Sequence, residues 1–272
     1  ESLKQFGHEG YGKPTTALNI LRETVMGREL FDFAFKTYAQ RWMFKHPTPA
    51  DFFRTMEDAS AVDLDWFWRG WFYTTDHVDI AISNVQWYRM VPPNTEGMDI
   101  LIQEDREREA ASITDIRNAE ENHRARTQRD TSLVDLYTEF DEMEMSDKES
   151  SQLDYIYSLY TDEERAKMND DRNYYEVEFS LIGGLVMPII VELTFKDGSK
   201  EIKQIPAEIW RKGDTKVSHV FITQKEVEYM SLDPYQQTAD TDLSNNKWVI
   251  HGLPERFFLQ DLNRLSLRKS AK

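Results

Sequence analysis

The first quarter of the chain places apolar residues at helical spacing. Ala17, Leu21 and Val25 form one apolar row after Pro14, and Gly27 stands directly behind that row. Proline suits the first turn of a helix because its missing N–H has no intrahelical partner there, and glycine suits the residue after the last turn. The pattern predicts a helix that begins at Pro14 and stops before Gly27.

Three further apolar runs follow before residue 76. The first has a wide apolar face made of Phe31, Ala34, Phe35, Tyr38 and Trp42. The second begins at Thr48, which has Asp51 at capping-box spacing, and the third begins at Asp63, where Val62 and Phe67 can form a hydrophobic staple. Four short helices in succession predict an antiparallel helical array.

From residue 78 the apolar period changes to alternation. The stretch 78–88, VDIAISNVQWY, alternates with a slip near Asn84 that fits a turn or bulge. Five more runs follow residue 173: YYEVEFSLIGG, LVMPIIVELTF, KEIKQIPAEIW, KVSHVFI and VEYMSLD. Turn residues separate them at 196–199 and 212–214. Short strands of this kind predict an antiparallel β-sandwich, and together with the helices an α+β fold.

An acidic stretch, 94–172, interrupts the predicted sandwich. It holds 23 acidic against 10 basic residues and so carries most of the chain's net charge of −16. Because it contains few apolar residues, it is predicted to be a solvated helical insertion, with a substrate-gating lid or a partner-docking arm as the alternatives. Two stretches within it are predicted to be amphipathic helices: LVDLYTEF at 133–140, and 150–168, with Leu153, Ile156, Tyr157 and Tyr160 on one side. The predicted organisation is a helical region at 1–76, a sandwich at 77–93 plus 173–240, the insertion at 94–172 and a tail at 241–272.

Composition removes several classes of function. The net charge of −16 argues against nucleic acid as a partner, because phosphate binding requires a basic surface. No run of 18 apolar residues occurs, which predicts that no segment spans a membrane. The opening ESLKQFGHEG lacks the pattern of a signal peptide, so any such peptide is expected outside this chain. With no cysteine, disulfides, thiolate nucleophiles and Cys-bound zinc are excluded.

The order of the N-terminal motifs resembles a known family. Tyr11-Gly12-Lys13-Pro14 precedes an apolar helix, a Gly-Arg-Glu-Leu-Phe turn follows, and PTPADFFRTMEDASAVDLDWFWRGWF comes next. This succession over residues 11–76 resembles the region downstream of the zinc site in aminopeptidase N-type zinc metallopeptidases. The resemblance implies a peptide substrate, a zinc cofactor, and a β-sandwich beside the helical region. It also favours an exported, periplasmic location, which the sequence itself leaves open.

The resemblance gives Tyr11 a role. In this family a tyrosine in a Y-x-K-G-like motif points into the catalytic cleft and donates its phenolic hydrogen to the oxyanion of the tetrahedral intermediate. Such a donor can act without carrying charge, because a phenol is protonated at neutral pH. Pro14 departs from the motif, which often has glycine there, so only Tyr11 is carried over as a catalytic residue, with Lys13 as its neighbour.

The zinc-binding motif itself is missing. A peptidase of this type needs H-E-x-x-H, because histidines at i and i+4 face one metal ion. The six histidines are His8, His46, His77, His123, His219 and His251, and none has another four residues away. His8-Glu9 resembles the start of the motif, but position 12 is glycine. We therefore expect this chain to be the C-terminal part of a longer enzyme, inactive without a missing N-terminal catalytic half.

The sequence is also compatible with other functions. A non-catalytic binding or scaffold module derived from a peptidase fold is the main alternative. A carbohydrate-binding sandwich would need exposed aromatic rings, for which Trp87 and Trp210 are candidates, although both fit strand-core positions better. Asp240, Asp242 and Asn245 offer hard oxygen ligands for a cation, but the turn glycine and bidentate glutamate of an EF-hand are missing. Residues of these types are also common turn formers.

Overall fold

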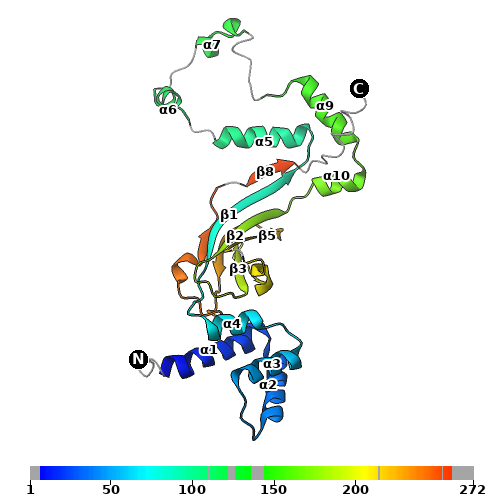
Figure 1. Ribbon diagram of the computed structural model, residues 1–272. Coiled ribbons are helices and arrows are strands. Elements are labelled where there is room, and N and C mark those ends of the chain that lie inside the picture. Colours follow the sequence, from blue (N-terminus) through cyan, green and yellow to red (C-terminus); the bar gives the residue numbers. More distant parts are fainter. Residues whose placement is uncertain are drawn as a thin grey trace. The chain divides into compact units, whose positions relative to one another are not determined.

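The computed structural model describes residues 7–108, 111–121, 126–135, 144–213, 215–252 and 254–258 (Figure 1). Its fold is α+β, with a helical N-terminal part followed by two sheets that form a sandwich, as the sequence predicts. The chain divides into two compact units. Unit 1 contains residues 1–87 and 174–253, and unit 2 contains residues 88–173 and 254–272.

The helices of unit 1 follow the predicted succession. They are η2 (His8–Gly12), α1 (Lys13–Ile20), η3 (Leu21–Val25), α2 (Arg28–Trp42), α3 (Pro49–Ser60) and α4 (Asp65–Tyr73). The turns η2 and η3 are π-helical and flank α1 on both sides. Gly27 has φ 81°, a conformation that glycine adopts without steric cost, and it separates η3 from α2.

Local cap chemistry sets two of these helix starts. The Asp51 carboxylate accepts hydrogen bonds from the Thr48 backbone N (2.8 Å) and Oγ1 (2.7 Å), which is the predicted capping box of α3. The prediction that the next helix begins at Asp63 is wrong, since α4 begins at Asp65. Asp63 Oδ1 instead accepts from the Asp65 backbone N at 3.2 Å, which holds Asp63 in the turn before the helix.

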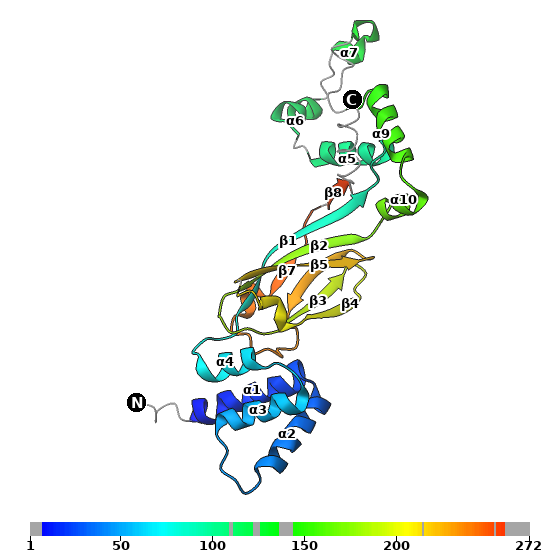
Figure 2. The same cartoon turned by 45° about the vertical axis from the view of Figure 1, so that its right-hand side comes forward.

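The sandwich consists of two four-stranded sheets (Figure 2). One has the order β5-β2-β1-β8, built from β1 (Ile80–Val91), β2 (Asn173–Leu181), β5 (Lys216–Thr223) and β8 (Glu255–Phe258). The other has the order β4-β3-β6-β7, built from β3 (Ile189–Phe195), β4 (Lys200–Ile205), β6 (Val227–Leu232) and β7 (Lys247–Val249). β3 pairs antiparallel with β4 and β6, β6 pairs antiparallel with β7, and β1 pairs parallel with β8.

Two strand predictions need correction. KEIKQIPAEIW is not one strand, because β4 ends at Ile205 and a 3₁₀ turn, η5 (Ala207–Trp210), follows Pro206. Proline has no N–H to donate to a sheet ladder, so it ends the strand. Near Asn84 the alternative of a turn is wrong, since β1 runs from Ile80 to Val91 as one element; the alternative of a bulge stays a prediction. β7 comes from the stretch predicted as a tail and forms an edge of its sheet.

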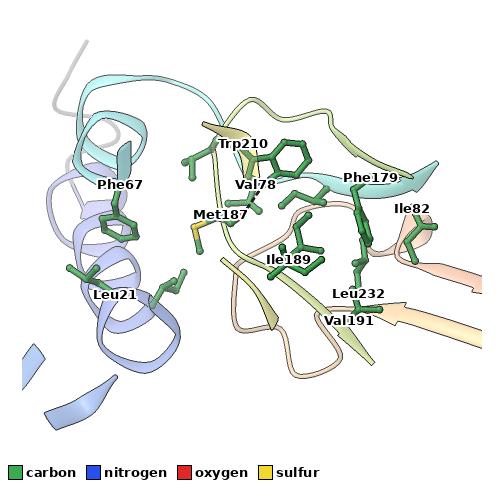
Figure 3. Packing of buried hydrophobic residues seen from close by; sticks show 14 of the residues in the cluster. Leu21, Phe67, Val78, Ile82, Phe179, Met187, Ile189, Val191, Trp210 and Leu232 are labelled. Carbon is green, nitrogen blue, oxygen red and sulfur yellow. Dashed lines mark hydrogen bonds between the residues drawn. The ribbon is translucent and has the colours of Figure 1, made fainter. Parts of the chain in front are cut away.

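The helices and the sheets of unit 1 share one hydrophobic core (Figure 3). Leu21 and Phe67, from the helical part, are fully buried in the same cluster as Met187, Ile189 and Phe179 from the sandwich. The predicted apolar face of the first helix is therefore internal, and the helices rest on the sandwich through side chains that are closed to water. Burial of this kind fixes the position of α1.

Unit 2 is helical apart from its strand segments. Its described helices are α5 (Thr95–Arg108), α6 (Ile113–Glu120), α7 (Arg126–Arg129), η4 (Thr131–Leu133), α9 (Asp147–Ser158) and α10 (Asp162–Met168). Capping boxes start α6, α9 and α10. The predicted amphipathic stretch with Leu153, Ile156, Tyr157 and Tyr160 is two helices, divided where Thr161 caps α10. The predicted helix LVDLYTEF, 133–140, lies mostly outside the described residues.

Unit 2 also contains an ion pair that joins two distant parts of the chain. Arg256 of β8 donates to the Glu104 carboxylate of α5 through Nε (2.9 Å) and Nη2 (2.6 Å). Both side chains are mostly buried, with exposed fractions of 16% and 14%. These two hydrogen bonds converge on Glu104 Oε1 and fix the position of both groups, so β8 is held to α5 as well as to β1.

None of the helices in the described part of the chain is both long enough and apolar enough to cross a membrane.

Candidate functional site

Tyr11 lies on η2, directly ahead of α1. Its side chain is 66% exposed, so the ring is not sealed in the hydrophobic core. The helix behind it is anchored, because Ala17 and Ile20 of α1 are buried. Lys13 Nζ also donates to the Thr74 backbone carbonyl at 3.3 Å, which ties the start of α1 to the end of α4. A solvent-accessible phenol thus sits on a fixed helix start, and its catalytic role stays a prediction.

The described residues do not fit a catalytic zinc ion. Within the described ranges, three potential ligand atoms from histidine or acidic side chains come within 4.8 Å of one another at Glu57, Asp63 and Asp65. All three are carboxylates, whereas catalytic zinc sites are built mainly from histidine nitrogens. The ligands of a zinc ion would have to come from elsewhere.

The Glu57, Asp63 and Asp65 cluster is explained by the turn that it stabilises. Glu57 Oε1 accepts from the Leu64 backbone N at 3.0 Å, next to the turn that Asp63 closes. Burial raises the pKa of Glu57, and the neighbouring charges of Asp65 and Asp63 raise it further. Asp63 and Asp65 are both exposed. The hydrogen bonds of Glu57 and Asp63 therefore stabilise the turn that leads into α4. The charges of Asp63 and Asp65 are screened by solvent because both side chains are exposed.

The predicted cation ligands lie in the loop before β7. Asp240 Oδ1 accepts from the Asp242 backbone N at 3.1 Å, and Asp242 Oδ1 accepts from the Ser244 backbone N and Oγ at 3.0 and 2.6 Å. Asn245 Nδ2 donates to Asp79 Oδ1 at 2.9 Å and reaches Asp242 Oδ2 at 3.4 Å. The three predicted residues therefore lie in one loop that hydrogen bonds hold together, and Asp79 joins them through its contact with Asn245.

Asp79 was missed at the level of sequence, although a signal existed. It is an acidic residue between Val78 and Ile80, in an otherwise apolar run, and it is only 7% exposed. A buried acid in a strand-like run indicates a specific partner, because a buried carboxylate is costly when it is unpaired. That partner, Asn245, is 166 residues away along the chain.

A cavity of about 420 Å³ opens between α4 and the sandwich within unit 1. Trp66, Val186 and Trp210 give it apolar walls, and Asp65 and Arg211 bring charge to its lining. Trp66 belongs to α4, and it lines this cavity together with residues of the sandwich. The cavity could hold an apolar group with a polar end.

The two tryptophans considered for a carbohydrate platform are both core residues. Trp87 is 8% exposed and stacks on Tyr175 with ring centroids 5.8 Å apart. Trp210 is 3% exposed, and its Nε1 donates to the Met187 backbone carbonyl at 3.0 Å. Neither ring offers a face to a sugar, which confirms the expectation that both fit the core.

Comparison with known proteins does not identify this chain. No model of a protein family matches it, and no curated protein matches it.

Proposed function

We propose that this chain is the part of an aminopeptidase N-type zinc metallopeptidase that follows the zinc site, and that it supplies Tyr11 to peptide-bond hydrolysis. The observation that carries the proposal is the position of Tyr11, which is exposed and stands at the start of a helix whose other end is buried. The motif order over residues 11–76 supports the same assignment. Because the described residues do not form a zinc site, the proposed role of this chain is limited to what Tyr11 and its supporting residues do.

The proposed chemistry is hydrogen-bond donation to developing negative charge. When water adds to the scissile carbonyl of a peptide, the carbonyl oxygen becomes an oxyanion, and a phenol directed at that oxygen stabilises it. The donation matters mainly in the transition state, since the ground-state carbonyl carries much less charge. The bond between Lys13 Nζ and the Thr74 carbonyl keeps the helix start in place during this step.

The substitution Tyr11→Phe tests the role in a zinc-loaded protein that contains the upstream sequence. The change removes the hydroxyl and keeps the ring. We expect kcat on amino-acid amide substrates to fall about 100-fold to 1000-fold, the usual effect of losing one oxyanion donor. KM is expected to change little, because the lost interaction is made mainly in the transition state.

A matched control is Tyr235→Phe, which alters a tyrosine of similar exposure, 68%, in the turn after β6. This variant should keep the parent kcat. A Tyr11→Phe enzyme with the kinetics of the parent would remove Tyr11 from the mechanism.

The second candidate function is a non-catalytic binding or scaffold module. The observation that favours it is the surface of α6, a capped helix without buried residues that exposes Ile113 and Ile116 to water. Apolar side chains on an exposed helix are typical of partner surfaces. The two functions are separated by the upstream sequence: an intact H-E-x-x-H motif favours the enzyme, and substituted ligand positions favour the scaffold.

A further inference from the structure

The loop 240–246 is fastened to the start of β1 by three hydrogen bonds. The Thr241 backbone N and Oγ1 both donate to the Val78 carbonyl, at 3.0 and 2.9 Å, and the Ile80 backbone N donates to Asp240 Oδ2 at 3.4 Å. These bonds bring Asp240 and the two asparagines of the loop, Asn245 and Asn246, next to Asp79. All of these residues belong to unit 1.

This place holds negative charge that is removed from water. Asp79 is buried, and Asp240 is half-buried. The two carboxylates are close enough for the charge of Asp79 to act on Asp240. In the described part of the chain, no lysine or arginine forms an ion pair with either carboxylate. Two neighbouring carboxylates out of water require a positive charge or a proton between them.

The same place holds buried amide atoms that lack partners. Asn246 is only 4% exposed, and neither its Nδ2 nor its Oδ1 has a hydrogen-bond partner. Its side chain lies close to the Asp240 carboxyl, although no hydrogen bond of ordinary geometry joins the two. Asn245 Oδ1 is also buried without a partner. Buried unsatisfied polar atoms are rare in native proteins, and three in adjacent residues point to a missing ligand.

We propose that Asp79, Asp240, Asn245 and Asn246 bind a calcium ion that fastens the loop 240–246 to β1. Calcium takes six to eight oxygen ligands, and carboxylates, amide carbonyls and water are its usual donors. Rotation of an asparagine amide exchanges its nitrogen and oxygen, so both amides can present Oδ1 to the ion. Asp242 is not among the proposed ligands, because its Oδ1 accepts two hydrogen bonds from Ser244, one of them only 2.6 Å long, whereas each Asp240 oxygen accepts a single longer bond from a backbone N.

The donor set distinguishes this ion from zinc and from magnesium. With oxygen donors alone, the site lacks the nitrogen or sulfur ligands that zinc prefers. Neutral amide oxygens from a flexible loop suit the adaptable coordination of calcium better than the strict octahedron of magnesium. The cluster of Glu57, Asp63 and Asp65 is a separate group of three carboxylates. It serves as a control for calcium binding that depends only on clustered negative charge.

The test is calcium binding by the 272-residue chain after removal of divalent ions, followed by calorimetry and by thermal unfolding. We expect binding of one ion per chain at this site and a Tm that rises with calcium concentration, because a ligand that binds only the folded state stabilises it. Magnesium at the same concentration should have a smaller effect. Neither measurement depends on peptidase activity, so the result is independent of the role of Tyr11.

Two kinds of variant locate the site. Asp240→Asn and Asp79→Asn preserve the shapes of the side chains and should weaken calcium binding at least tenfold. Asn245→Asp should lower the Tm without calcium and tighten calcium binding, a gain that loss of folding cannot mimic. Asp65→Asn, in the control cluster, should leave binding unchanged. The proposal is overturned if the parent chain binds no calcium, if binding is unchanged in both Asp240→Asn and Asp79→Asn, or if binding is lost in Asp65→Asn.

Discussion

Gly183 lies where two segments of backbone approach too closely for a side chain. A Cβ atom at this residue would stand 2.2 Å from the His77 carbonyl oxygen and 2.8 Å from the Asp79 N. Two hydrogen bonds hold the segments together. The His77 N donates to the Gly183 carbonyl and the Gly183 N donates to the Asp79 carbonyl, both at 3.2 Å. We expect Gly183→Ala to lower the free energy of unfolding by about 3 kcal/mol, measured by urea denaturation.

Gly12→Ala is the control for that substitution. The nearest atom to a Cβ at Gly12 is the Gly7 carbonyl oxygen, 3.8 Å away, and Gly12 lies in a helical turn. Alanine is the better helix former, so stability should stay the same or rise by up to about 1 kcal/mol. Similar losses in both variants would show that steric approach at Gly183 is not the cause.

Asp51 gives the start of α3 a dependence on pH. Hydrogen bonds from the Thr48 backbone and side chain hold the pKa of Asp51 below its ordinary value. A depressed pKa in the folded state means that the stabilisation is present at neutral pH and is lost as the pH falls through the folded-state value, below about 4. Asp51→Asn should therefore lower Tm at pH 7, and its difference from the parent should shrink in more acidic buffer.

Asp58→Asn is the matched control on the same helix. The Asp58 side chain is exposed and makes a 3.3 Å ion pair with Arg41, which is expected to contribute little. A difference between Asp51→Asn and the parent that stays constant down to pH 2 would contradict the proposed cap.

Residue contacts were predictable from the sequence where the partners are close along the chain. Thr48 and Asp51 are three residues apart, so their spacing alone indicates the capping box. The contact of Asp79 with Asn245 depends on a fold that brings together residues 166 positions apart. No local pattern contains that information.

At the scale of the element, the pair of Arg256 and Glu104 joins β8 to α5. Replacing one partner leaves the other charge mostly buried without its counterion. We expect Arg256→Met to cost about 2–3 kcal/mol of local stability in unit 2. Hydrogen exchange of the α5 and β8 amides measures this loss.

A second substitution separates a broken pair from a general loss of packing. Adding Glu104→Leu to Arg256→Met removes the stranded charge and should recover part of the lost protection. Asp162→Asn, which disturbs an exposed pair with Arg165, should cost less than about 1 kcal/mol. Additive losses in the double variant would mean that the two side chains are not coupled.

Element types were more predictable than element boundaries. Periodicity identified the helices before residue 76 and the strands after residue 77, since burial on one side imposes a period of 3.6 or 2. The boundaries depended on a single hydrogen bond or on a proline, whose nitrogen has no hydrogen to donate. Asp63 closes a turn and does not begin α4, and Pro206 ends β4.

At the scale of the molecule, the acidic insertion leaves and re-enters one sheet between neighbouring strands. Ser83 Oγ donates to the Glu178 carbonyl, and Trp87 stacks on Tyr175, so the contacts run in opposite order along β1 and β2. The two strands are therefore antiparallel and can be joined by a tight turn. We expect replacement of residues 92–172 by Asn-Gly to leave unit 1 folded, with a cooperative thermal transition and the near-UV dichroism of its buried tryptophans. A broad transition without near-UV signal would show that unit 1 needs the insertion.

The sequence anticipated the α+β class and the interruption of the sandwich by charge. It did not reveal that the helices and the sheets share one core. Each apolar face is visible in the sequence, but which faces meet depends on packing between distant segments. The apolar character of Leu21, Phe67 and Met187 predicts that each is buried, but it does not predict that they lie in the same core.

The shared core has a practical bearing on how the gene can be divided. A product that stopped at residue 76 would carry Leu21 and Phe67 without the sandwich side chains that cover them. Its newly exposed apolar side chains would promote self-association, although the fragment would keep Lys13 and Thr74, whose hydrogen bond ties α1 to α4 in the folded chain. Fragments meant for crystallisation or assay should keep both ends of unit 1 together.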